Sequence, residues 1–70
     1  MIYILTYTMV MPGTPTGTVS DLFEDAFTDR VQAERGFKNL ILSREYIRKE
    51  LWVREPGGRR TLLMEERYAA

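Results

Sequence analysis

The sequence predicts a small α+β domain, in which one helix packs on a three- to four-stranded, mostly antiparallel sheet in the order β-α-β-β(-β). Three observations predict it. Residues 2–11 are uncharged and rich in Tyr, Ile, Thr and Val, which is typical of a strand. Residues 20–35 have apolar positions at helical spacing, and residues 45–68 form two runs separated by Pro-Gly-Gly, which is typical of a hairpin.

Length and composition limit the possible functions. The 70 residues make one domain, residues 1–70, and a chain this short buries only about 60% of its extended surface. We therefore expect a homo-oligomer or a protein partner to complete it. The chain has no cysteine and no histidine, which excludes disulfides, thiolate nucleophiles, Cys or His zinc ligation and an imidazole base. We expect no catalytic activity, no metal and no cofactor.

Charge gives no general attraction to nucleic acid or acidic lipid, because ten basic and ten acidic residues cancel. The first predicted strand, residues 2–11, is too short to cross a membrane as a helix and has no basic residues before it. We expect no membrane segment and a cytoplasmic protein. Tyr3 and Tyr7 share the bulkier face of this strand. They are candidates for stacking on a flat ligand, although such residues more often pack against a helix.

The helix is predicted for residues 20–35. Its N-cap is expected at Thr18 or Ser20, and Gly36 is expected as a left-handed residue after its last turn. Residues 12–17 before it are predicted to form a loop, because Pro and Gly alternate with Thr. The apolar positions that recur at helical spacing are Val19, Leu22, Phe23, Ala26, Phe27 and Val31.

After the helix, residues 37–43 include an apolar run that predicts a short buried strand. Continuing this strand straight into the hairpin would make it unusually long, so we expect a bend or bulge at residues 43–46. The alternative for the next segment is a helix over residues 44–52 that Ser43 caps.

The hairpin, residues 45–68, is predicted to have a two-residue turn at Gly57-Gly58. This turn fixes the cross-strand pairs. They are Val53 with Leu62, Leu51 with Met64, Lys49 with Glu66 and Ile47 with Tyr68. A slip of one residue would turn Leu62 and Met64 toward the charged side, which favours this register.

The opposite face of the hairpin is charged except for Trp52 and Leu63, which face each other in the predicted register. One helix cannot cover both faces of the sheet, so a monomer would expose this face. Trp and Arg are the residues most enriched at binding hot spots. The predicted partner-binding residues are Trp52, Leu63, Arg48, Arg54 and Arg67.

These observations predict a non-catalytic protein-interaction module that acts through the outer sheet face around Trp52 and self-associates. Small accessory or inhibitory proteins, including those of phages, are often of this kind. One alternative is a homo-oligomer that binds an aromatic or flavin-like small molecule between subunits. Its predicted stacking residues are Tyr3, Tyr7 and Tyr46, together with Trp52.

A second alternative is a nucleic-acid-binding accessory protein. Its basic residues would be Arg44, Arg48, Lys49, Arg54, Arg59 and Arg60, and the glutamates interleaved with them weaken their field. An enzyme would need Glu, Tyr, Lys or Arg for acid-base chemistry, and no pair of these has diagnostic spacing.

The predicted β-α-β-β order is similar in outline to dodecins, which are short chains that assemble and bind flavins with aromatic residues. The step Gly36-Phe37 after a strand and a helix is similar to one in the dimeric barrels of the antibiotic-biosynthesis-monooxygenase type. Both are similarities of shape, which carry little information about function.

Overall fold

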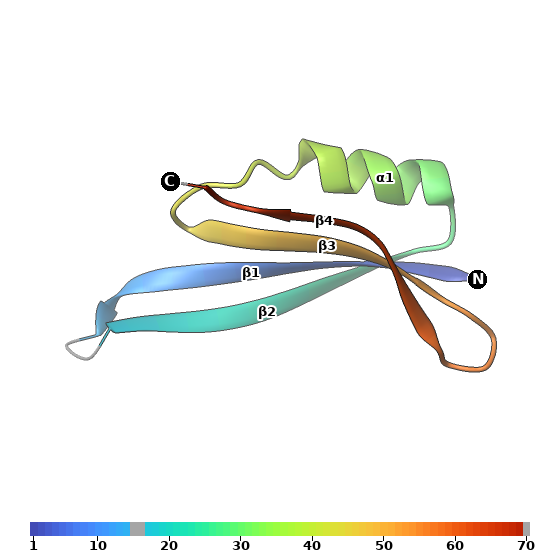
Figure 1. Cartoon of the computed structure of the whole chain (residues 1–70), viewed down its shortest axis with the longest axis horizontal. Helices are drawn as coiled ribbons and strands as arrows, with labels where there is room; N and C mark the ends of the chain where they lie inside the picture. Colours follow the sequence, from blue (N-terminus) through green and yellow to red (C-terminus); the bar gives the residue numbers. More distant parts are fainter. Residues whose placement is uncertain (15–16, 70) are drawn as a thin grey trace.

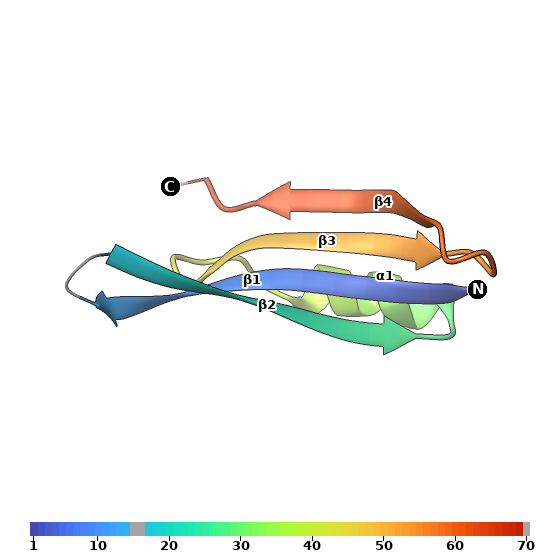
Figure 2. The same ribbon diagram turned by 90° about the horizontal axis from the view of Figure 1, so that it is seen from below.

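The computed structural model describes the backbone of residues 1–14 and 17–69, and the side chains of these residues outside 11–21. One helix lies on one face of a four-stranded antiparallel sheet (Figure 1), which confirms the predicted class. The elements are β1 (Ile2–Thr14), β2 (Gly17–Phe27), α1 (Arg30–Asn39), β3 (Tyr46–Arg54) and β4 (Arg60–Arg67). The strands lie in the order β2-β1-β3-β4 (Figure 2).

The predicted position of the helix is wrong, because residues 20–27 belong to β2 and the helix begins only at Arg30. The two phenylalanines in this segment explain the error. Phe23 and Phe27 are four residues apart, which places them on one side of a helix and equally on one side of a strand. In the structure Phe27 pairs with Tyr3 and Phe23 with Tyr7 across β1 and β2. The order is therefore β-β-α-β-β, which differs from the outline that suggested dodecins and dimeric barrels.

The helix begins after Asp29, whose Oδ1 accepts a hydrogen bond from the Val31 backbone N–H at 3.2 Å. The sequence signal for this start is the spacing Asp29-x-x-Gln32, in which an N-cap residue precedes a glutamine by three positions. The predicted caps, Thr18 and Ser20, have backbone in β2, and their side chains lie outside the described residues.

Residues 37–43 do not form the predicted strand, because Phe37 is a buried residue of α1 and the helix continues to Asn39. Gly36 lies inside the helix rather than after it. A Cβ at Gly36 would lie 3.2 Å from Cζ of Phe27, so glycine allows α1 to approach β2 closely. The bend expected at residues 43–46 is present, since Ser43 Oγ accepts backbone N–H bonds from Glu45 and Tyr46.

The predicted loop at residues 12–17 is shorter than expected. β1 continues to Thr14 and β2 begins at Gly17, and residues 15–16 between them lie outside the described residues.

The hairpin is confirmed, and the alternative helix over residues 44–52 is wrong. The predicted pairs Lys49 with Glu66 and Leu51 with Met64 are present, and Tyr68 donates its backbone N–H to Ile47. Nearer the turn the register moves by one residue.

In that part of the hairpin Trp52 pairs with Leu62 and Val53 with Thr61, so the predicted pair of Val53 with Leu62 is wrong. The register shifts because the turn has three residues rather than the predicted two. The turn contains Pro56, Gly57 and Gly58 between Glu55 and Arg59, and it is closed by Gly58 N–H to Glu55 O at 2.8 Å and Glu55 N–H to Arg59 O at 2.9 Å. A three-residue loop of this kind has a left-handed last residue, and Gly58 has φ 86°.

Leu63 absorbs the difference between the two registers as a bulge in β4. The pair Lys49 with Glu66 and the three-residue turn together leave one residue of β4 without a partner on β3. Leu63 and Met64 consequently both pack against the core on the helix side, while Leu62 lies with Trp52 on the other side.

The core lies between α1 and the sheet. Leu5, Ala33, Phe37 and Leu51 form its buried cluster. Lys49 lies at its edge and is 4% exposed. Its Nζ donates to the backbone oxygens of Phe37 at 2.5 Å and of Leu40 at 2.8 Å, and it lies 3.1 Å from Glu66 Oε2. An ammonium has three donors, so these three acceptors satisfy a charge that would be costly to bury alone.

We expect Gly58→Ala to lower the free energy of unfolding by about 1–2 kcal/mol, because alanine is strained at positive φ. Gly57→Ala is the matched control, since a Cβ meets nothing within 4 Å at either position and only Gly58 has positive φ. Urea denaturation of the two variants measures the difference. Equal losses would show that the left-handed turn residue is not what stabilises the hairpin.

We expect Lys49→Met to lower the free energy of unfolding by about 2 kcal/mol or more, since it removes charged hydrogen bonds to helix carbonyls that remain buried. Lys38→Met is the control, because Lys38 is exposed in the last turn of α1 and contributes at most about 1 kcal/mol through the helix dipole. Urea denaturation distinguishes them, and the proposed role of Lys49 fails if both variants lose the same stability.

Candidate functional site

The outer face is the side of the sheet away from α1, and its side chains form rows that run across the strands. The registers of the three strand pairs define these rows. In the order β2, β1, β3, β4, the apolar row contains Ala26, Ile4, Trp52 and Leu62, and the acidic row contains Glu24, Thr6, Glu50 and Glu65. The basic row, nearer the β3–β4 turn, contains Ile2, Arg54 and Arg60, and the distal row contains Leu22, Thr8, Arg48 and Arg67.

The distal row neutralises much of the acidic row. Arg48 Nη2 lies 3.0 Å from Glu50 Oε2 and 3.9 Å from Glu65 Oε2, and Arg67 Nε lies 3.0 Å from Glu65 Oε1. The hydroxyl of Thr6 donates to Glu50 Oε1 at 3.4 Å. These contacts connect three strands on a face that the helix does not cover.

Arg60 and Glu24 join opposite edges of the sheet. Arg60 is on β4 and Glu24 on β2, yet Arg60 Nη1 lies 3.4 Å from Glu24 Oε1. The sheet must curl round the outer face for edge strands to meet, and β4 passes to the side opposite α1 as it approaches the turn (Figure 1). Curling also explains why Ile4 is only 5% exposed with no helix over it.

The structure brings together four of the five predicted partner-binding residues on the outer face, namely Trp52, Arg48, Arg54 and Arg67. Leu63 is not among them, because the bulge turns it to the core, and Leu62 takes its place beside Trp52. Their role in binding a partner remains a prediction. Trp52 is half-buried rather than fully exposed, whereas Leu62 is 40% exposed.

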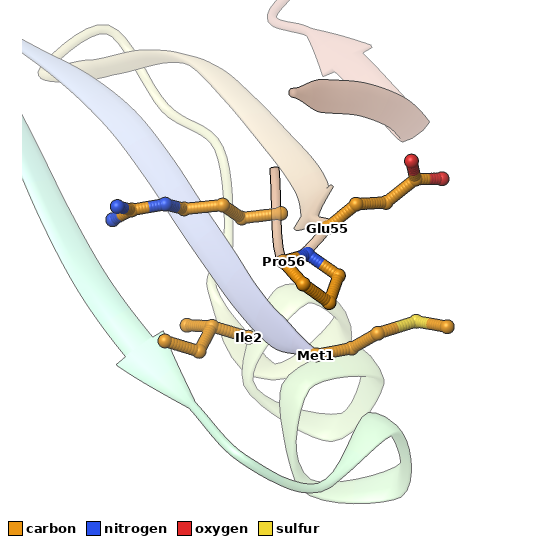
Figure 3. Close-up of a pocket in the computed structure, with 5 residues that line it drawn as sticks. Met1, Ile2, Glu55 and Pro56 are labelled. Carbon is orange, nitrogen blue, oxygen red and sulfur yellow. The ribbon is translucent and has the colours of Figure 1, made fainter. Parts of the chain in front are cut away.

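A shallow hollow of about 200 Å³ lies at the turn end of the sheet. Met1, Ile2, Arg54, Glu55 and Pro56 line it. The side chains of Met1 and Ile2 extend in opposite directions there, with Pro56 beside them (Figure 3). The hollow therefore extends from the basic row to the N-terminus of the chain, where β1 begins.

A second hollow, of about 330 Å³, lies on the helix side, and we call it the tyrosine hollow. It lies between α1 and the strands β1, β2 and β3. Its lining consists of Leu5, Tyr7, Asp25, Phe27, Gly36, Asn39, Leu40 and Tyr46. Leu5 is buried, while Asp25 and Asn39 are exposed at the rim.

Two of the three predicted stacking residues, Tyr7 and Tyr46, meet in the tyrosine hollow, with ring centroids 6.3 Å apart and an interplanar angle of 55°. A second bulge makes this possible. The register between β1 and β3 shifts so that Tyr46 pairs with Met9 and Arg48 with Thr8, which turns Tyr46 to the helix side. Tyr3 packs against the core and does not line the hollow.

The sequence reasoning missed Asp25 and Asn39 as lining residues. In the predicted helix over residues 20–35, Asp25 lies on the polar side, away from the apolar positions. Its strand position between Phe23 and Phe27 puts it on the helix side instead, so alternation in residues 23–27 was the available signal.

Tyr7 connects the tyrosine hollow to a neighbouring aromatic ring. Its ring stacks on Phe23 at 5.4 Å with an interplanar angle of 15°. Burial raises the pKa of the Tyr7 phenol above its ordinary value of 10.0, and the charge of Asp25 and a hydrogen bond to it raise this pKa further. The neutral phenol is therefore the form that the fold favours.

Other kinds of site have no support within the described part of the chain. No three acidic side chains there come close enough to hold a metal ion. No helix among residues 1–14 and 17–69 has the length and apolar character needed to span a membrane. Comparison with protein-family models, curated proteins and solved structures found no match.

We expect Tyr7 to ionise above pH 10, later than an unperturbed tyrosine, and to stabilise the fold in a pH-dependent way. A raised folded-state pKa gives stability that is fully present below the unfolded pKa and is lost as the pH rises through the folded pKa. Titration of tyrosinate absorbance measures this. Tyr7→Phe should remove the late component, and Asp25→Asn should move it to lower pH.

The control for Asp25 is Glu24→Gln, which removes a neighbouring carboxylate from the opposite face of β2. An equal change in the late component with Glu24→Gln would contradict the role of Asp25.

Proposed function

We propose that this chain is a non-catalytic interaction module that binds a second copy of itself through the outer face. The observation that supports this is the order of the rows, in which an apolar row crosses all four strands between a basic and an acidic row. Trp52 lies within the apolar row, and aromatic residues together with arginine are the common anchors of protein interfaces.

The rows are complementary to themselves. A two-fold axis along the apolar row would place this row against its own copy and would exchange the rows on its two sides. Arg54 would then face Glu50 of the second copy, and Arg60 would face Glu65 of the second copy. Such opposite charges fix the register of an interface and reject partners that lack them.

Arg60 and Glu24 partly cover the face in the single chain, so self-association requires their contact to open or to exchange. Their side chains are 42% and 47% exposed. An exposed pair of this kind contributes about 0–1 kcal/mol, which is small beside the burial of an apolar side chain such as Leu62. Exchange of Arg60 from Glu24 to the second copy therefore costs little.

The ion pairs also weigh against the nucleic-acid alternative. Arg48, Lys49 and Arg60, three of the six basic residues of that alternative, contact glutamates on their own sheet, which weakens the basic field that a phosphate backbone requires.

We expect Arg54→Glu to weaken self-association by roughly tenfold or more, because glutamate at this position would face Glu50 of the second copy. Arg59→Glu is the matched control, since Arg59 is exposed in the turn outside the rows. Sedimentation velocity over a range of protein concentrations measures the association. The proposal fails if the parent chain stays monomeric at millimolar concentration, or if the two variants weaken association equally.

Leu62→Lys is a second variant, which tests the role of the apolar row in self-association. It should also favour the monomer, whereas Ile41→Lys, at a position that is 80% exposed and lies outside the sheet, should not. Circular dichroism shows whether each variant remains folded.

A further inference from the structure

Asp25 is a carboxylate without a cation. All ten lysine and arginine side chains and the N-terminal amine lie in the described part of the chain, and none of them comes within 4.0 Å of Asp25. The sequence before Arg30 contains four acidic residues and no basic one. Asp25 thus lies at the rim of the tyrosine hollow with a carboxylate that no lysine, arginine or N-terminal amine contacts.

Aromatic rings surround the same space. Tyr7, Phe27 and Tyr46 all line the tyrosine hollow, and they come from three different strands. The face of an aromatic ring attracts a cation, most strongly where water is partly excluded. Tyr7 is held in place by its stack on Phe23, so its position costs little further ordering on binding.

The end of α1 also borders the tyrosine hollow, and Lys49 occupies its carbonyls. The helix ends at Asn39, which lines the hollow, and a helix C-terminus carries partial negative charge. Lys49 supplies the nearest positive charge at these carbonyls, and Glu66 at 3.1 Å balances it. The charges at the helix end therefore offset one another, and the attraction of the hollow for a cation comes from Asp25 and the aromatic rings.

We propose that the tyrosine hollow binds a small organic cation of the quaternary ammonium class, with its methyl groups against the rings of Tyr7, Phe27 and Tyr46 and its charge beside Asp25. The lining is mostly apolar and offers few oxygen ligands, which suits an alkylated ammonium rather than a hydrated metal ion. A volume of about 330 Å³ is at the low end for ligand pockets, so the ligand is small. This site lies on the side of the sheet opposite the outer face and is independent of self-association.

Choline is the probe, and the matched control ligand is the neutral alcohol in which a tert-butyl group replaces the trimethylammonium group. Both have the same shape, so only the cation distinguishes them. We expect choline to shift the backbone amide NMR signals of Tyr7, Asp25 and Tyr46 saturably at constant ionic strength, and the neutral alcohol to bind roughly tenfold more weakly or not at all. Equal binding of the two ligands, or no saturable shift with choline, overturns the proposal.

Two variants locate the site. Asp25→Asn and Tyr46→Leu should each weaken choline binding by roughly tenfold, since the first removes the charge and the second removes a ring while retaining an apolar side chain. Glu55→Gln, an exposed carboxylate at the other end of β3, should leave the affinity unchanged. Unchanged affinity in both site variants overturns the assignment. The comparison of the two ligands on the parent chain decides the proposal even if one variant does not fold.

Discussion

The buried ammonium of Lys49 is the interaction on which the arrangement of this small domain depends. Its three donors meet two carbonyl oxygens at the end of α1 and one carboxylate on β4, while its side chain belongs to β3. A helix of ten residues is marginal by itself, so its position comes from tertiary contacts. Lys49 also lies 4.3 Å from the centroid of the Phe37 ring, which places the charge directly beside the core.

The same residue fixes the register of the hairpin and so decides which side chains reach the outer face. Lys49 pairs with Glu66 at one end of the hairpin. The three-residue turn at the other end sets a register that differs from this pairing by one residue. The bulge at Leu63 reconciles the two. It moves Leu63 into the core and leaves Leu62 beside Trp52, so a mismatch of one residue determines the composition of the apolar row.

The class of the fold could be predicted from the sequence. So could the hairpin pairs of Lys49 with Glu66 and Leu51 with Met64, because apolar and charged residues alternate there. The location of the helix could not be predicted from apolar spacing, since Phe23 and Phe27 satisfy both periods. The capping pattern at Asp29 was the more reliable signal. For the site, Tyr7 and Tyr46 were identified separately, but their meeting depends on a bulge that no local pattern in the sequence marks.

Both candidate surfaces follow from bulges, one near the start of β3 and one at Leu63 in β4. Strict alternation would place Tyr46 on the outer face with Arg48 and Trp52, and the tyrosine hollow would then lose one of its three rings. It would also place Leu63 beside Trp52 and hide Leu62. Bulges often occur next to functional sites because they re-aim single side chains without changing the sheet. Here one bulge supplies a ring to the helix side and the other completes an apolar row on the outer face, so the two sides of one thin sheet present different sets of side chains.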